Sequence, residues 1–145
     1  MTNKNRIPQL YLRLALGLGF LIPVADRIGW LGSAGQKGIN WGNFENFAAY
    51  TNTLLPFLSR QMASVMALLA TIAEILIGTC LIIGFKTRTA AYGGFLLTLI
   101  FALCMAVFTG IKAPFNYSVF SVSVGSLLLA FVPVYYWSLD NGFKG

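Results

Sequence analysis

The sequence contains no histidine, and this absence removes several kinds of chemistry. Imidazole is an axial ligand of many haems, a common ligand of copper and a frequent proton carrier near neutral pH. A bis-histidine haem, a histidine-rich copper site and a histidine-based proton relay are therefore excluded. The two cysteines, Cys80 and Cys104, are too few for a structural zinc site, so no metal site is predicted.

Charge is also scarce. Only 10% of the 145 residues are charged and 57% are hydrophobic, whereas about a quarter of the residues in soluble domains are charged. A chain of this length has too small an interior for so many apolar side chains, so we predict an integral membrane protein with the lipid bilayer as its solvent. The net charge is +6, but the basic residues are scattered singly at the ends of apolar runs, which argues against a nucleic-acid partner.

Four apolar runs are close to the ~20 residues that a helix needs to cross a bilayer. Joined in sequence, they predict an all-α fold, a four-transmembrane-helix antiparallel bundle that forms one integral membrane domain over residues 1–145. Both termini are then on one side of the membrane. The expected spans are residues 7–31, 61–83, 89–108 and 118–137.

Residues 32–59 differ from the four runs and predict an extracytoplasmic cap. Their first half is rich in glycine, which indicates a loop. The second half predicts a short amphipathic helix with Asn43 as its N-cap and Glu45 in its first turn. This helix is too short and too polar to cross a membrane, so we expect it to lie in the interface or over the bundle.

The distribution of basic residues predicts the orientation. Positive charge is enriched on the cytoplasmic side of membrane proteins, which favours cytoplasmic termini in a bacterial or archaeal inner membrane. Small residues four apart, such as Ala15 and Gly19, favour close packing within the chain over a homo-oligomer. The inner face would carry Lys4, Arg6, Lys86, Arg88 and Lys144, and the outer face Arg27, Lys37, Arg60 and Lys112, partly offset by Asp26 and Glu45.

Glu74 lies within the second span, roughly 15 Å from its inner end. An ionised group at that depth usually has a partner, a function or both. Arg13 lies roughly 8 Å inside the first helix from the same face, and an extended arginine side chain covers most of the difference. We therefore predict a buried Arg13–Glu74 pair, which serves either as a structural strut or as a ligand-binding or proton-exchanging site. In a third interpretation Arg13 reaches the headgroups and Glu74 faces another donor, such as Thr71, Thr98 or a water.

A second group of candidates lies near the outer end of the first span. Asp26 and Trp30 are four residues apart and share a helix face. Together with Arg27 and Trp41 they could line an outward-facing pocket; the alternative is a hydrated helix end with the tryptophans in the interface.

The two cysteines are not expected to form a disulfide. Their predicted heights differ by roughly 15 Å, whereas the Cα atoms of a disulfide lie within ~7 Å of each other. The sequence also lacks a Cys-x-x-Cys motif, which disfavours a thiol–disulfide enzyme.

The stretches YLRLALGLGFL and EILIGTCLIIGFKTRTAA resemble the DoxX family of small bacterial and archaeal four-helix membrane proteins. The family pattern has an arginine early in the first helix, then a glutamate followed by glycines and a Gly-x-x-Thr-Arg turn. Many relatives also carry His-Gly and a lysine near the end of the first helix, where this chain has other residues. The matching residues are Arg13, Glu74, Gly78, Gly84, Thr87 and Arg88, and the departures are Pro23, Val24, Asp26 and Arg27.

The resemblance implies four transmembrane helices and a membrane subunit associated with a redox system. Some relatives belong to quinone-reducing sulfur oxidoreductases, so we expect a quinone or similar small apolar molecule in the bundle, with Arg13 and Glu74 as polar contacts. No cofactor is built into the sequence, and no catalytic motif is complete, so electrons would come from a partner redox protein or a reduced substrate. The alternative is a non-enzymatic scaffold, assembly helper or small-molecule binder in which the buried Arg–Glu pair is structural.

Overall fold

The computed structural model describes residues 6–142, and every regular element in that range is helical. Three helices are long and apolar enough to cross a membrane: α1 (Arg6–Arg27), α3 (Arg60–Ile83) and α4 (Thr87–Phe108). These elements confirm an all-helical integral membrane protein. The shorter elements are α2 (Phe44–Leu54), α5 (Ala113–Asn116), α6 (Val119–Ala130) and the 3₁₀ helix η2 (Leu139–Asn141).

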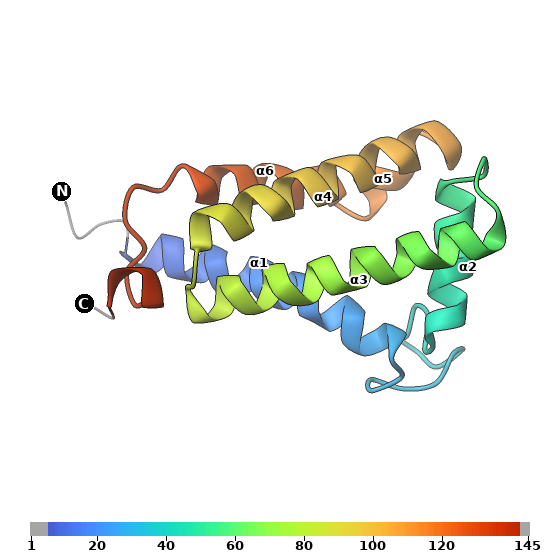
Figure 1. The fold of residues 1–145 in the computed structure, drawn as a ribbon, viewed down its shortest axis with the longest axis horizontal. Helices are drawn as coiled ribbons and strands as arrows, with labels where there is room; N and C mark the ends of the chain where they lie inside the picture. The colour runs from blue at the N-terminus through green and yellow to red at the C-terminus, as the bar shows by residue number, and fades with distance from the viewer. Residues whose placement is uncertain (1–5, 143–145) are drawn as a thin grey trace.

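The helices α1, α3, α4 and α6 run along the long axis of the molecule (Figure 1). The principal packing partners are α1 with α3 and α4 with α6, and α2 lies across one end of the bundle against α3. We call that end the cap end. The opposite end, which carries residue 6, the α3–α4 turn and η2, is the terminal end.

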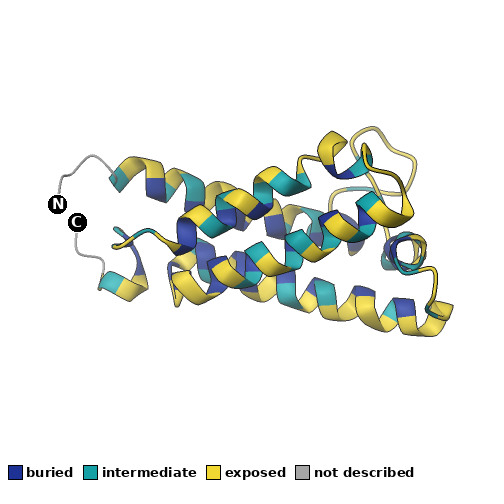
Figure 2. Cartoon of the chain, turned by 90° about the horizontal axis from the view of Figure 1, so that it is seen from above, coloured by how far each residue is buried: buried dark blue, intermediate teal, exposed yellow. Residues whose placement is uncertain are grey.

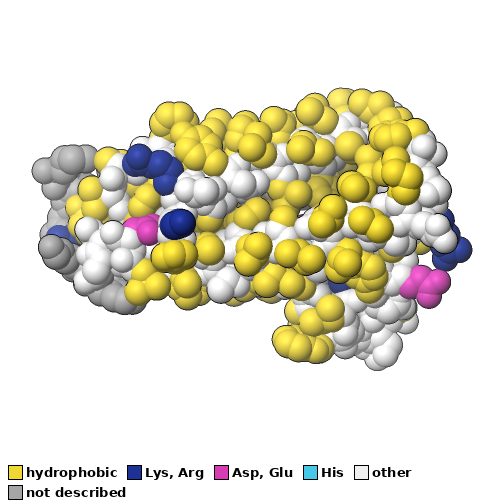
Figure 3. Space-filling view, in the orientation of Figure 1, with side chains coloured by type: hydrophobic (Ala, Val, Ile, Leu, Met, Phe, Trp, Pro, Cys, Tyr) yellow, Lys and Arg dark blue, Asp and Glu magenta, His cyan; other side chains and the backbone are white. Residues whose placement is uncertain are grey.

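The outward surface of the long helices is apolar. Figure 2 shows the buried residues turned toward the axis and the exposed residues turned outward, and in Figure 3 hydrophobic side chains cover the visible flank while charges lie mostly near its two ends. Large apolar side chains, such as Leu69, Leu76, Ile100 and Leu128, are more than half exposed. A lipid environment would cover this surface, so the molecule fits a bilayer.

Two glycines set the register of α1 against α3. A Cβ atom added to Gly17 would lie 2.6 Å from Ile82 Cγ1, and one added to Gly78 would lie 2.9 Å from the carbonyl oxygen of Gly17. The two backbones therefore approach too closely for any larger residue. Small residues permit such approach between membrane helices, where apolar burial gives little driving force.

The prediction of a continuous helix over residues 118–137 is wrong for its last seven residues. The helix α6 ends at Ala130 and the chain then turns across the terminal end. Pro133 explains the break, because proline lacks a backbone N–H and disfavours helical geometry in the residue before it. At its start, Ser118 has a φ of 55°, which separates α6 from α5.

The remaining boundaries agree more closely. Asn43 caps α2 as predicted, since its side chain accepts a hydrogen bond from the backbone N–H of Asn46. The helix α1 ends at Arg27 rather than at residue 31, and Gly29 follows with a φ of 78°. The orientation prediction also used Lys4 and Lys144, which lie outside the described residues.

Candidate functional site

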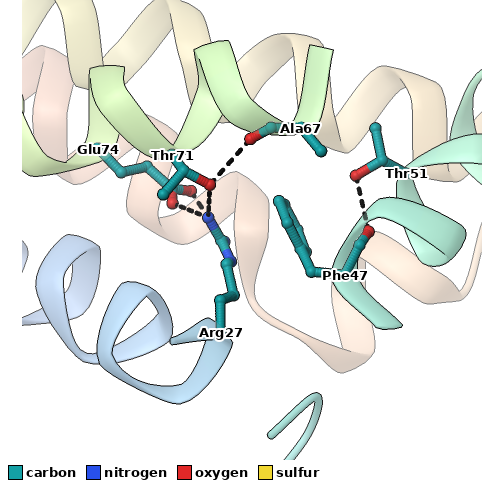
Figure 4. Close-up of polar contacts among 6 residues, drawn as sticks. All are labelled: Arg27, Phe47, Thr51, Ala67, Thr71 and Glu74. Carbon is teal, nitrogen blue, oxygen red and sulfur yellow. Dashed lines mark hydrogen bonds and ion pairs between the residues drawn. The ribbon is translucent and has the colours of Figure 1, made fainter. Parts of the chain in front are cut away.

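The carboxylate of Glu74 pairs with Arg27, which lies at the end of α1. Both side chains are buried, with exposed fractions of 3% for Arg27 and 8% for Glu74. One terminal guanidinium nitrogen contacts Glu74 Oε2 and donates to Thr71 Oγ1 at 3.1 Å, and the other donates to Glu74 Oε1 at 3.2 Å (Figure 4). This bidentate arrangement is the strong form of an arginine–carboxylate interaction.

Aromatic rings cover the guanidinium on the side of the cap. The ring of Phe47 lies with its centroid 3.5 Å from Arg27 Cζ, and the ring of Trp41 lies 5.2 Å away. A cation over an aromatic face is attracted by the ring's negative face. The hydrophobic contacts of Phe47 with Ala48 and Ala67 hold α2 over the ion pair and keep water from it.

The predicted Arg13–Glu74 pair is therefore wrong, and side-chain direction gives the reason. Side chains on a helix lean toward its N-terminus. Because α1 runs from the terminal end to the cap end, Arg13 leans away from Glu74 and Arg27 leans back toward it. The helix α3 runs the opposite way, so Glu74 leans toward the cap end, where Arg27 lies.

Arg13 instead fastens the C-terminal segment to the terminal end. Its side chain is 1% exposed, and its two terminal nitrogens donate to the carbonyl oxygens of Tyr136 at 3.2 Å and Trp137 at 2.7 Å. Gln9 also donates to the Tyr136 carbonyl, at 3.2 Å. These bonds satisfy backbone acceptors that the chain exposes after α6 ends.

The α3–α4 turn forms the other half of this contact. Asp140 accepts backbone hydrogen bonds from Lys86 at 2.6 Å and Thr87 at 2.7 Å, and its own N–H donates to the carbonyl of Gly84 at 2.9 Å. Burial alone raises the pKa of Asp140, but the hydrogen bonds from Thr87 and Lys86 and the charge of Arg13 outweigh it and hold the pKa below its usual value. We call these contacts, together with those of Arg13, the terminal lock.

The residues predicted to line an outer pocket lie in different environments. Asp26 is 4% exposed and accepts backbone hydrogen bonds from Asn40 and Gly42, both at 2.9 Å, so its role is to hold the loop that leads to α2. Trp30 is 81% exposed, so it does not line an enclosed pocket. Asp26 meets Trp41 only through the backbone N–H of Trp41, at 3.4 Å. The side chains of Arg27 and Trp41 come together beside Phe47, which the sequence interpretation missed.

An apolar groove lies beside the ion pair, between α2, α3 and α4. Its volume is about 160 Å³. Ala70 on its wall precedes Glu74 by one helical turn, and Met66 and Ile100 are exposed toward lipid. Its lining, almost entirely carbon, consists of Thr51, Leu54, Leu55, Met66, Ala70, Leu97, Ile100, Phe101 and Cys104.

The sequence model of the DoxX family matches residues 9–110, which is most of the chain. The chain belongs to the DoxX family. Membership identifies it as a membrane protein associated with redox systems. No match was found among curated proteins or among solved structures.

The DoxX pattern residues fall into separate structural roles. Gly78 permits the close approach of α1 and α3, and Glu74 belongs to the ion pair. Gly84 and Thr87 belong to the terminal lock, and Arg88 donates to the carbonyl of Val132 at 3.3 Å. Both cysteines are free, as the sequence predicted. Most residues of the pattern thus have a structural role in the fold. Glu74 is the one that is buried near the cap end, where a ligand site could lie.

Proposed function

We propose that this DoxX protein is the membrane subunit of a quinone-linked redox system and binds a quinone, or a similar small apolar molecule, in the groove between α2, α3 and α4. The observation that carries the proposal is the position of this groove, one helical turn from a buried carboxylate on a lipid-facing flank. An apolar cavity of roughly 150 Å³ takes up benzene, so a groove of about 160 Å³ suits a single substituted ring. The exposed rim at Met66 and Ile100 gives a hydrocarbon tail a path to lipid.

The chemistry divides between this chain and a partner. Reduction of a quinone takes two electrons and two protons. Glu74 would relay the two protons one at a time from the aqueous side, each time taking up a proton before it passes that proton to the quinone, and the two electrons would come from a partner redox protein. We further propose that α6 together with α5 completes a fourth membrane crossing, with the terminal end in the cytoplasm. Arg6, Lys86 and Arg88 at that end support this orientation.

The test is to extract the protein gently from its membrane and identify co-purifying molecules by mass spectrometry. We expect a quinone in about equimolar amount with the wild type and little with Ala70→Trp, whose indole would fill the groove. Leu69→Trp is the matched control, because Leu69 is 53% exposed and does not line the groove. Equal quinone content in both variants, or none in the wild type, would contradict the proposal.

A non-enzymatic scaffold or assembly helper is the second candidate. It is favoured by the saturation of the ion pair, since both Glu74 oxygens are used by Arg27 and aromatic rings cover the guanidinium. Such an arrangement suits a permanent strut. A preparation with no quinone but with a tightly bound partner protein in fixed ratio would support this candidate over the first.

A further inference from the structure

The groove offers little to a ligand that carries carbonyl oxygens. The hydroxyl of Thr51 is already donated to the carbonyl of Phe47 at 2.9 Å, and the Cys104 thiol is only a weak donor. Moving a carbonyl oxygen out of water costs free energy unless the oxygen gains a new hydrogen-bond donor. The groove by itself therefore suits the hydrocarbon part of a ring but not its carbonyl groups.

An unused donor lies just beyond the groove. The Nε–H of Arg27 is buried and has no hydrogen-bond acceptor among residues 6–142. The terminal nitrogens of the same guanidinium hold Glu74 and Thr71, so Nε can accept a new partner without breaking the ion pair. Most buried polar groups are hydrogen-bonded, and Arg27 Nε is one of the exceptions in residues 6–142, together with the Nε atoms of Arg6 and Arg13.

The ring of Phe47 lies against this guanidinium, and its cluster of contacts extends to the groove. Phe101 lines the groove and packs against the cluster that contains Phe47. The ring of Phe47 lies over the guanidinium, and Figure 4 shows it between Arg27 and Thr51, which also lines the groove. The side chain of Phe47 is therefore the aromatic group on the guanidinium whose movement would change access to Arg27.

We propose that the groove and Arg27 form one site for a lipid-soluble aromatic carbonyl compound, with Phe47 as its gate. The ring of the ligand occupies the groove, and one carbonyl oxygen accepts a hydrogen bond from Arg27 Nε when the Phe47 ring swings aside. Glu74 acts as a positioning residue, because its two oxygens fix the guanidinium while Nε stays available. This inference rests on the proposed function and adds to it the group that would recognise the ligand.

The test uses the fluorescence of Trp41, which lies 5.2 Å from the guanidinium carbon. A Trp30→Phe/Trp137→Phe background leaves Trp41 as the only tryptophan. The ligands are tetramethyl-1,4-benzoquinone and the hydrocarbon 1,2,4,5-tetramethylbenzene, which share a ring and methyl groups but differ in their carbonyls. We expect the quinone to quench Trp41 with saturation, because quinones accept excited-state electrons at short range.

The decisive variant is Phe47→Leu, which keeps an apolar side chain but removes the aromatic face from Arg27. Loss of a cation–π contact lowers the cost of opening, so the affinity for the quinone should rise roughly fivefold, while that for the hydrocarbon, measured by its displacement of the quinone, stays the same. Phe44→Leu is the control, because Phe44 packs on Phe47 and not on Arg27. Arg27→Lys should lower quinone affinity about tenfold without affecting the hydrocarbon, provided that circular dichroism shows an unchanged helix content.

Two results would contradict the proposal that Phe47 acts as a gate. One is a Phe47→Leu variant that binds quinone and hydrocarbon with the wild-type ratio, and the other is quinone binding that leaves Trp41 fluorescence unchanged. If either occurs while Ala70→Trp still abolishes quinone binding, the proposed function stands and only the role of Arg27 and Phe47 falls. If the wild type binds no quinone, both fall.

Discussion

The charge of Glu74 is balanced by Arg27, whereas the spacing of residues along the sequence had predicted Arg13. Removing one partner of a buried ion pair leaves the other charge uncompensated, which costs about 3–5 kcal/mol, whereas replacing both by apolar residues is often neutral. We therefore expect Glu74→Leu to lower the free energy of unfolding by that amount and Arg27→Met/Glu74→Leu to regain most of it. Unfolding in mixed detergent micelles gives both values.

Arg13 provides the control for that cycle. Its hydrogen bonds go to the carbonyls of Tyr136 and Trp137, so Arg13→Met and Glu74→Leu should have additive effects on the free energy of unfolding. A coupling between Arg13 and Glu74, with none between Arg27 and Glu74, would restore the pairing that the sequence suggested.

Asp26 holds the connecting loop through backbone hydrogen bonds. Asp26→Ala removes the acceptor for the N–H groups of Asn40 and Gly42, and each lost partner costs about 1–3 kcal/mol in a buried setting. We predict faster hydrogen exchange at these two amides, with the exchange of central α3 amides such as Ile77 unchanged. Unchanged exchange at residues 40 and 42 would show that the loop is held by other contacts.

At the scale of elements, the α3–α4 turn depends on Gly84. This residue has a φ of 71°, and a Cβ added to it would lie 2.3 Å from Ser138 Cβ. Gly84→Ala should therefore destabilise the protein by at least about 1 kcal/mol. Gly19→Ala is the matched control, because no atom lies within 4 Å of its added Cβ, and alanine within a helix is favoured by roughly 0.5–1 kcal/mol. Thermal midpoints of the two variants should move in opposite directions.

The terminal lock has a pH dependence of known sign. The pKa of Asp140 is held below its usual value in the folded protein, so the lock contributes stability above the unfolded pKa of about 4. That contribution is lost as the pH falls through the lower, folded pKa. We predict that the stability difference between the wild type and Asp140→Asn shrinks as the pH falls below about 4.

Glu45→Gln is the control for this titration, because Glu45 forms an exposed pair with Arg60 at the other end of the molecule. The difference in the free energy of unfolding between Glu45→Gln and the wild type should be small at every pH. A wild-type advantage over Asp140→Asn that grows as the pH falls would contradict the assigned direction.

The elements also show what the sequence can predict. The boundaries of α3 and α4 lie within two residues of those expected, because long apolar runs bounded by polar turns leave few alternatives. The end of α6 was missed because the prediction of one helix over the apolar run 118–137 gave no weight to Pro133, the residue that signals the break. The partner of Glu74 was missed because spacing along the axis ignores the lean of side chains. Phe47 was missed because the path of the glycine-rich loop between α1 and α2, which places Phe47 over Arg27, cannot be read from the sequence.

At the scale of the whole molecule, the proposed orientation is open to direct measurement. In a Cys80→Ala/Cys104→Ala background, Lys37→Cys places a thiol at the cap end and Lys86→Cys one at the terminal end. We predict that a membrane-impermeant maleimide labels position 37 in intact cells and position 86 only after permeabilisation. The reverse pattern would place the termini outside.

The most direct test of the ligand site is photolabelling with a one-ring azidoquinone in native membranes, followed by peptide mapping. We predict adducts on groove residues such as Met66 and Cys104, and their loss in Ala70→Trp but not in Leu69→Trp. Adducts confined to the opposite, lipid-facing flank, for example at Tyr11 or Leu128, or equal labelling of the groove in both variants, would contradict a quinone site in this bundle.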